Sequence, residues 1–272
     1  TDSINALFSM THRGGIGADG KTGDGCGLLV DINKSFYKTA IHKEKGIELP
    51  ERFAIGQVFY FKKIVSLLPK IEKILSDEGL ELITYRNVPI SKNVLGKIAL
   101  DCLPNIYQLF IKSQNENLSE NEFQTAVLQS RKFIEEIYLD DEKLYFCSMS
   151  SKTIIYKGLM LPKDINNFYL DLKSKNFKSS ICVFHQRFST NTSPRWYLAQ
   201  PFRLLAHNGE INAIRGNRNW VKARSNNFET PLIPKIQNFK QIVNESGSDS
   251  STLDNMIEIL IKGGIDIFRA IR

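Results

Sequence analysis

The chain has 272 residues, of which 42% are hydrophobic and 24% charged, and its formal net charge is +7. These values are ordinary for a globular protein and exclude a disordered tail, a collagen-like fibre and a disulfide-knotted miniprotein. The excess of Lys and Arg favours an anionic ligand without requiring nucleic acid. No segment approaches the roughly 18 uncharged apolar residues of a membrane-spanning helix, and the start of the chain lacks a signal-peptide pattern.

The first half of the chain predicts a mixture of helices and strands. Apolar residues at helical spacing follow two capping candidates, Asp2 and Ser3, and a glycine-rich turn region covers residues 12–27. Residues 62–77 have an apolar helical face; Pro69 either kinks this helix or marks its start, and Gly79 ends it. Strands are predicted over residues 28–32, 53–61, 94–102 and 106–112.

The second half adds a long helix over residues 120–139 and a hairpin of strands 143–148 and 152–157 that turns over 149–151. Further helices are predicted over 162–172, 253–261 and 265–272, and an apolar strand over 180–187. No repeat or linker divides the chain. Neighbouring strands with short turns, and helices between the groups, predict a single α+β domain with mainly antiparallel sheets.

The four cysteines are widely spaced and include no CxxC pair: Cys26, Cys102, Cys147 and Cys182. Such a sparse set in a long chain is typical of reduced cysteines in an intracellular protein. The four histidines also lack the spacing of metal ligands, and we expect no metal site in this segment.

A phosphate-loop pattern occurs in the glycine-rich region, where residues 15–22 read GIGADGKT. In a nucleotide site, Lys21 would contact the terminal phosphates and Thr22 a magnesium ion. That loop must leave a buried strand and begin a helix, but residues 8–13 do not resemble a buried strand. Glycines at 23, 25 and 27 disfavour a following helix. We therefore reject the match, and nucleotide binding stays only as an alternative.

A basic stretch runs from residue 187 to residue 224. Its seven cations, against the single acid Glu210, are Arg187, Arg195, Arg203, Arg215, Arg218, Lys222 and Arg224. Either an anion binds here or the stretch packs against an acidic neighbour. Trp196, Tyr197, Phe202 and Trp220 interleave with the arginines, so a surface for single-stranded nucleic acid is a second alternative. Apolar runs that should be buried, and the lack of a known module, argue against it.

Three segments of the last third carry side chains suited to a free amino acid. Arg187 at a strand end could bind an α-carboxylate through two parallel hydrogen bonds, and Asp249 near a helix start could bind an α-ammonium. The Asn208 side chain and the Gly209 backbone N–H could donate to a developing oxyanion. Taken singly, these residues are equally explained as a surface arginine, a turn and a helix cap, for which Ser248 and Ser250 compete.

The longest motifs resemble the glutamine amidotransferase domain of glutamate synthases. They are MTHRGGIGAD with TGDGCG (10–27), FHQRFSTNTSPRWYLAQPFRLLAHNGEINAIRGNRNW (184–220) and GSDSSTLDN (247–255). Weaker similarity covers essentially the whole chain. These sequence segments resemble the ferredoxin-dependent form of plastids and cyanobacteria more than the pyridine-nucleotide form. The abundance of Lys, Ile and Asn would suit an AT-rich plastid genome, so we expect the chloroplast stroma, with a bacterial cytoplasm as the alternative.

This resemblance implies a four-layer αββα N-terminal-nucleophile hydrolase fold, in which two antiparallel sheets lie between helical layers. It also implies hydrolysis of L-glutamine to glutamate and ammonia. In the family, the ammonia reaches a synthase centre where 2-oxoglutarate is reductively aminated with FMN and a [3Fe-4S] cluster. The implied partners are therefore glutamine, the rest of a glutamate synthase chain and ferredoxin, with no nucleic acid and no membrane.

Residue roles also follow from the resemblance. Arg187 would hold the substrate carboxylate, Asp249 the amino group, and Asn208 with Gly209 the oxyanion. Arg13, in the HRGG string, would lie near the nucleophile. The further substrate-binding candidates are Thr190, Asn212 and His207; we expect the two histidines His185 and His207 to be packing or hydrogen-bonding residues and not general bases.

One expected residue is missing from the sequence. The family nucleophile is a cysteine at the mature N-terminus shortly before the HRGG string, and none of the four cysteines has that place. Thr1 resembles part of a helix cap more than a nucleophile. We therefore expect residues 1–272 to be a partial domain, truncated at both ends, inactive as a glutaminase alone and without a cofactor of its own.

Overall fold

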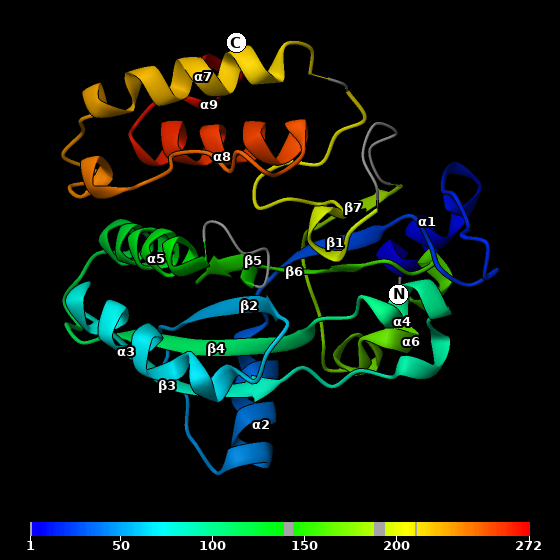
Figure 1. The fold of residues 1–272 in the computed structure, drawn as a ribbon. Helices are drawn as coiled ribbons and strands as arrows, with labels where there is room; N and C mark the ends of the chain where they lie inside the picture. The colour runs from blue at the N-terminus through cyan, green and yellow to red at the C-terminus, as the bar shows by residue number, and fades with distance from the viewer. Residues whose placement is uncertain (1, 139–143, 188–193, 210) are drawn as a thin grey trace.

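The computed structural model describes residues 2–138, 144–187, 194–209 and 211–272 (Figure 1). The seven strands of these residues are β1 (Cys26–Asp31), β2 (Ala54–Tyr60), β3 (Leu80–Asn87), β4 (Asn105–Ser113), β5 (Leu144–Ser150), β6 (Thr153–Gly158) and β7 (Cys182–Gln186). They form a four-stranded sheet of order β3-β4-β2-β5 and a three-stranded sheet of order β6-β1-β7. Every pairing is antiparallel, which confirms the predicted class of fold.

The helices of the described residues surround and extend these sheets. They are α1 (Asp2–Ser9), α2 (Lys34–Lys45), α3 (Leu68–Asp77), α4 (Lys97–Asp101), α5 (Glu120–Glu135), α6 (Ile165–Phe168), α7 (Ile214–Arg224), α8 (Asp249–Lys262) and α9 (Ile267–Ile271). In Figure 1, α3 lies on the outer side of the four-stranded sheet, and α7 and α8 form a separate layer beyond α5.

Strand β2 shows how one sequence serves two interfaces. All seven of its residues are buried, and successive side chains point to opposite faces of the sheet. Ala54 and Val58 pack with α3 and α5, whereas Ile55 and Phe59 pack in the core shared with β1, β6 and α2. A strand buried on both faces is mostly apolar, which is why residues 53–61 lack an alternating pattern. The exception is the buried Gln57, whose Oε1 accepts from Gln108 Nε2 (2.9 Å).

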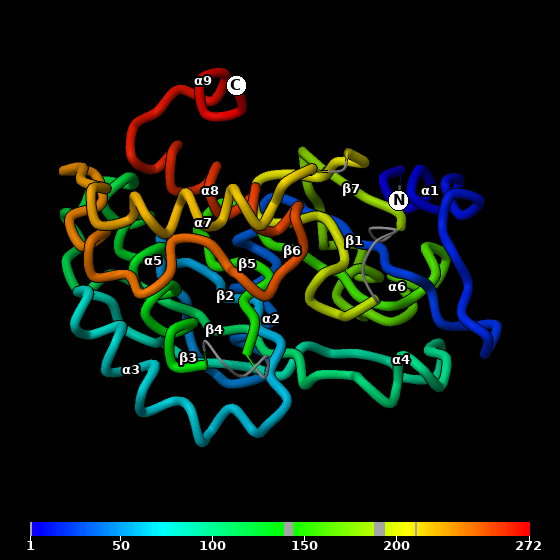
Figure 2. The backbone as a smooth tube through the Cα atoms, turned by 45° about the horizontal axis from the view of Figure 1, so that its top comes forward, coloured from blue at the N-terminus to red at the C-terminus, as the bar shows by residue number. Residues whose placement is uncertain are grey.

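Helix α5 is buried on nearly all sides. Phe123 and Val127 face the four-stranded sheet, while Leu128 joins a second apolar cluster with α8 and the segment 233–243. Figure 2 shows α7 and α8 side by side, with α9 and the C-terminus farther from the sheets. Helix α8 and the segment 233–243 are thereby packed against α5, which itself lies on the four-stranded sheet.

Several sequence predictions are confirmed. Strands occur within or around the predicted ranges 28–32, 53–61, 106–112 and 180–187, and α5 with a following 3-10 turn covers the predicted helix up to Tyr138. Helix α3 begins at Leu68 with Pro69 in its first turn, so the proline marks a start and not a kink. Gly79 then adopts φ 70°, a left-handed conformation that glycine adopts easily.

The strand predicted over residues 94–102 is wrong, because this region forms a 3-10 turn and α4. The glycine-rich region supplies the reason: Asp19 Oδ2 accepts from the Ile98 N–H (2.9 Å) and Thr22 Oγ1 from the Ala99 N–H (3.1 Å). Side chains nearly 80 positions away in sequence thus cap the first turn of α4. Local propensity could not reveal those partners.

The predicted hairpin of residues 143–157 is also wrong. Strand β5 pairs with β2 and strand β6 with β1, so the chain crosses from one sheet to the other between them. The turn itself is short, as predicted, but adjacency in sequence does not specify pairing. Residues 162–172 form short helical pieces and not one helix, and α2 and β3 were not predicted.

Candidate functional site

The candidate site begins at the end of β7, an edge strand of the smaller sheet. His185 and Gln186 are its last buried residues, and the exposed Arg187 follows. Arg187 has φ 91°, which is uncommon for a residue other than glycine, and its N–H donates to the Gly25 carbonyl (2.9 Å). Strained backbone of this kind clusters at functional sites. No described carboxylate forms an ion pair with Arg187.

The glycine-rich region packs directly against this strand end. A Cβ atom on Gly14 would lie 1.8 Å from Gln186 Nε2 and 3.2 Å from Asp24 Oδ1, so only glycine permits this approach without movement. Arg13, the residue before it, ends a 3-10 turn and is exposed. The HRGG string therefore lies beside the end of β7.

The Asn208 turn is joined to β7 by a buried histidine. His185 Nε2 donates to Asn208 Oδ1 (2.8 Å) and lies 3.1 Å from the His207 carbonyl oxygen. Gln200 holds His207 from the other side, since the His207 N–H donates to Gln200 Oε1 (3.0 Å) and Gln200 Nε2 to the His207 carbonyl (3.1 Å). The Gly209 N–H donates to His207 Nδ1 (3.1 Å), so this expected oxyanion donor is engaged.

Asp249 is connected to the same segment. It is the first residue of α8, whose N-cap is Ser248, so the cap role that competed for Asp249 belongs to its neighbour. Asp249 Oδ2 accepts from the Ile211 N–H (3.0 Å), three residues after Asn208. Arg218 of α7 also donates to the Gly247 carbonyl (2.6 Å), which fixes α7 against the start of α8.

Direct contacts thus link four of the predicted segments. The glycine-rich region contacts β7, and β7 contacts the turn at 207–209. Ile211, which follows that turn, contacts Asp249 at the start of α8. Asn208, Gly209 and Asn212 are exposed, and Asp249 is half-buried. Thr190 lies outside the described residues.

The phosphate-loop alternative finds no support. No helix follows Thr22; the chain leads into β1. Thr22 is 5% exposed, and its Oγ1 donates to Asp19 Oδ2 (2.6 Å). This hydrogen bond and three from backbone N–H groups, those of Lys21, Thr22 and Ile98, lower the pKa of Asp19. The region is built as a cap for α4.

The nucleic-acid alternative also finds no support. Three of the four interleaved aromatic residues are buried, Trp196 at 2%, Tyr197 at 8% and Phe202 at 1% exposure, whereas Trp220 is 62% exposed. Buried rings cannot stack on bases. Arg203 in the same stretch packs against acidic residues, which confirms for this residue the acidic-neighbour interpretation.

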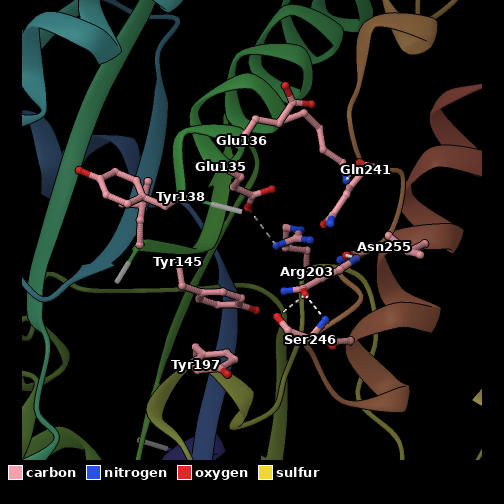
Figure 3. Close-up of a pocket in the computed structure, with 14 residues that line it drawn as sticks. Glu135, Glu136, Tyr138, Tyr145, Tyr197, Arg203, Gln241, Ser246 and Asn255 are labelled. Carbon is pink, nitrogen blue, oxygen red and sulfur yellow. Dashed lines mark hydrogen bonds and ion pairs between the residues drawn. The ribbon is translucent and has the colours of Figure 1, made fainter. Parts of the chain in front are cut away.

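That acidic neighbourhood borders a cavity of about 80 Å³ between α5, β5 and the segment 241–255 (Figure 3). The Arg203 side chain is 8% exposed, donates to Glu258 Oε2 (3.1 Å) and lies 3.9 Å from carboxylate oxygens of Glu135 and Asp254. Arg131 pairs with the same Glu258 at 2.5 Å. None of the predicted site residues is among the described residues that line this cavity.

The thiols of the chain are poor nucleophiles. Burial raises the pKa of all four, to about 12 for Cys147 and above the ordinary value for Cys26, Cys102 and Cys182. Within the described residues, no three His, Cys, Asp or Glu side chains gather as metal ligands. None of the described helices is long and apolar enough to span a membrane.

Two residues of the site were not predicted in this role, His185 and Gln200. His185 lies two positions before Arg187 in the same motif, so a local signal existed. The partners that give these residues their role lie 7 to 23 positions away. No spacing rule predicts those contacts.

Several glutamate synthases are similar to this chain in sequence. The chain is 38% identical over 272 residues to the chloroplastic ferredoxin-dependent glutamate synthase of Oryza sativa subsp. japonica, covering 97% of the chain and 17% of that protein. It is 37% identical over 269 residues to the glutamate synthase [NADPH] large chain of Azospirillum brasilense, covering 96% of the chain and 18% of that protein. It is also 38% identical to the glutamate synthase [NADH] of Saccharomyces cerevisiae, covering 97% of the chain and 13% of that protein.

The chain therefore spans less than a fifth of the length of these relatives. A family model, glutamine amidotransferases class-II, matches residues 1–272, and this family has the N-terminal-nucleophile hydrolase fold that the motifs implied. Since the match extends over the whole chain, the protein belongs to the class-II glutamine amidotransferases.

Proposed function

We propose that residues 1–272 form the substrate-binding part of a glutaminase domain in a glutamate synthase. The observation that carries this proposal is the pair of contacts that joins three distant segments: His185 to Asn208 and Ile211 to Asp249. These contacts bring the end of β7, the turn at 207–209 and the start of α8 into one connected region.

Arg187 and Asp249 would hold the two charged ends of glutamine. Arg187 is exposed and has no ion-pair partner among the described residues, so its guanidinium is available for a bidentate bond to the α-carboxylate. Each oxygen of Asp249 accepts one backbone N–H, from Ile211 and Ser250, and Oδ1 also accepts from Ser250 Oγ (3.2 Å). A carboxylate has about four acceptor sites, so about one is left for the α-ammonium.

Asn208 and Gly209 would stabilise the oxyanion that forms when a thiolate attacks the side-chain amide of glutamine. The Asn208 oxygen is bonded to His185, so its Nδ2 is the free end of the amide. The Gly209 N–H becomes a second donor only if the His207 ring turns away from it. We assign Arg13 to the surroundings of the nucleophile, and Thr190, Asn212 and His207 to secondary contacts with substrate.

We propose that none of the four thiols of residues 1–272 is the nucleophile. The four thiols of residues 1–272 have raised pKa values, and two of them, Cys26 and Cys147, are fully buried. We therefore propose that another part of the longer protein supplies the thiolate, and that residues 1–272 alone bind glutamine without hydrolysing it.

For the whole protein we propose synthesis of glutamate from 2-oxoglutarate and the ammonia released from glutamine, as part of nitrogen assimilation. Ferredoxin is the proposed electron donor and the chloroplast stroma the proposed location, which two of the plant relatives support by name. FMN and a [3Fe-4S] cluster would supply the electron transfer. The four cysteines here lie in different elements and do not form a cluster site, so both groups would bind outside this segment.

The test is glutamine hydrolysis by the full-length protein. We expect Asn208→Ala to lower kcat by about 10²- to 10³-fold, because one oxyanion donor is lost, with KM changed little. A kcat equal to that of the unmodified protein would contradict the assignment. Glutamate formation with reduced ferredoxin, compared with NADPH and NADH, tests the electron donor separately.

A further inference from the structure

We propose that His185 is the positioning residue that determines which end of the Asn208 amide faces the substrate. The proposal rests on the proposed function, because it concerns the oxyanion donor assigned there. It adds a role for a residue that the sequence motifs had left to packing. It also explains why a buried histidine lies beside an exposed turn.

The tautomer of His185 follows from its surroundings. Nε2 lies 3.1 Å from the carbonyl oxygen of His207, and a carbonyl oxygen only accepts hydrogen bonds. Nε2 must therefore carry a proton. Burial lowers the pKa of His185 below its ordinary value and favours the neutral ring, in which Nδ1 is then unprotonated.

The protonated Nε2 in turn orients Asn208. It lies 2.8 Å from Oδ1 of that side chain, so the amide presents its acceptor to the histidine. The reversed amide would place two N–H donors against each other. Nδ2 is thereby directed away from His185, as an oxyanion donor must be.

The position of His185 is fixed by strand β1 and by the chain at Gln200. His185 is 8% exposed and pairs across the sheet with Gly27 of β1. A Cβ on Gly27 would lie 2.7 Å from the Gln200 carbonyl oxygen, so the chain at Gln200 packs directly on the sheet at this glycine. Gln200 then bonds both polar backbone groups of His207, which fixes the carbonyl that selects the tautomer.

The experiment compares three substitutions of His185 in the full-length protein, with glutamine hydrolysis as the readout. Gln places a side-chain N–H near the position of Nε2, whereas Asn is shorter and does not reach Asn208. We expect His185→Asn and His185→Leu to lower kcat by about 10-fold or more with little change in KM, since a misdirected donor weakens only transition-state binding. His185→Gln should keep kcat within about threefold of the value of the unmodified protein.

The double variant His185→Leu/Asn208→Ala separates positioning from general structure. If His185 acts through Asn208, the double variant should have the same kcat as Asn208→Ala alone. An equal loss in both backgrounds, or equal activity of the Gln and Asn variants, would overturn the proposal. If His185→Leu does not fold, as judged by thermal unfolding, the Gln and Asn pair still decides.

The same variants distinguish the proposed role of Asn208 in the oxyanion site from the proposed positioning role of His185. Full activity in Asn208→Ala would overturn the oxyanion assignment of the proposed function and this proposal with it. Loss of activity in Asn208→Ala, together with full activity in both His185→Asn and His185→Leu, would overturn this proposal alone.

Discussion

Arg187 and Arg203 belong to one basic stretch but lie in opposite environments. Arg203 is 8% exposed and surrounded by carboxylates from α5 and α8, while Arg187 is exposed, has a strained backbone and pairs with no described carboxylate. The first arrangement satisfies the guanidinium inside the protein; the second leaves it for a ligand. Net charge along a sequence therefore does not identify a binding residue, and the location of the carboxylates does.

The two regions also differ in what their removal should affect. Around Arg203, the charges compensate one another, so removing one leaves others buried and unpaired. Around Arg187, water replaces whatever is removed. Stability should respond to the first region and substrate binding to the second.

The largest effect is expected from Arg203→Met. Glu258 and Asp254, 12% and 1% exposed, would lose a shared cation, and removal of one partner of a buried ion pair typically costs about 3–5 kcal/mol. Urea unfolding should show this loss. The exposed Arg215→Met is the matched control, with an expected change below about 0.5 kcal/mol. Equal stability of the two variants would show that the buried cluster contributes nothing.

Acid should weaken the same cluster through Glu258. Burial alone would raise the pKa of this carboxyl, but the nearby Arg131 and Arg203 lower it from 4.5 to about 2. The stabilisation is complete above pH 4.5 and is lost as the pH falls towards 2; it amounts to about 3 kcal/mol. Glu258→Gln should be less stable than the unmodified protein at pH 7. The difference between their free energies of unfolding should become smaller as the pH is lowered to 3. A difference in the free energy of unfolding that does not depend on pH would contradict the low pKa of Glu258.

Arg187→Ala should leave stability within about 0.5 kcal/mol and weaken glutamine binding. Loss of a bidentate charged contact is expected to raise KM about 10²-fold, equivalent to about 2.7 kcal/mol. Steady-state glutaminase kinetics of the full-length protein measure this. A normal rate at low glutamine would contradict the role of Arg187 and remove the contrast with Arg203.

The smallest effect is expected from Asp249→Asn. The single amide oxygen can still accept from the Ile211 N–H but not also from the Ser250 N–H, so a stability loss of about 1 kcal/mol is expected. Loss of the charge should in addition raise KM for glutamine about 10-fold, or about 1.4 kcal/mol. Ser248→Ala is the matched control, since it removes the cap of α8 and should cost about 1 kcal/mol of stability while KM is kept. If both variants behave alike, Asp249 is only part of the helix start.

Much of the site was predictable because it depends on residue chemistry at short range. Arg187 after a strand, an Asn-Gly turn and an acid at a helix start were each visible in the sequence. The engagement of the Gly209 N–H by His207 was not, although the two residues are only two positions apart, because it depends on the orientation of the His207 ring, which sequence spacing does not specify.

The fold shows the same division. The sequence by itself determined the helices and strands whose patterns are strong locally, such as α3 with Pro69 in its first turn and β2 with its mostly apolar residues. Tertiary structure decided that residues 97–101 are helical, because Asp19 and Thr22 cap them, and that β5 and β6 belong to different sheets. It also decided that Arg203 is structural and that His185 contacts Asn208. Each of these outcomes depends on a partner distant in sequence, and local propensity is too weak an energy to override such contacts.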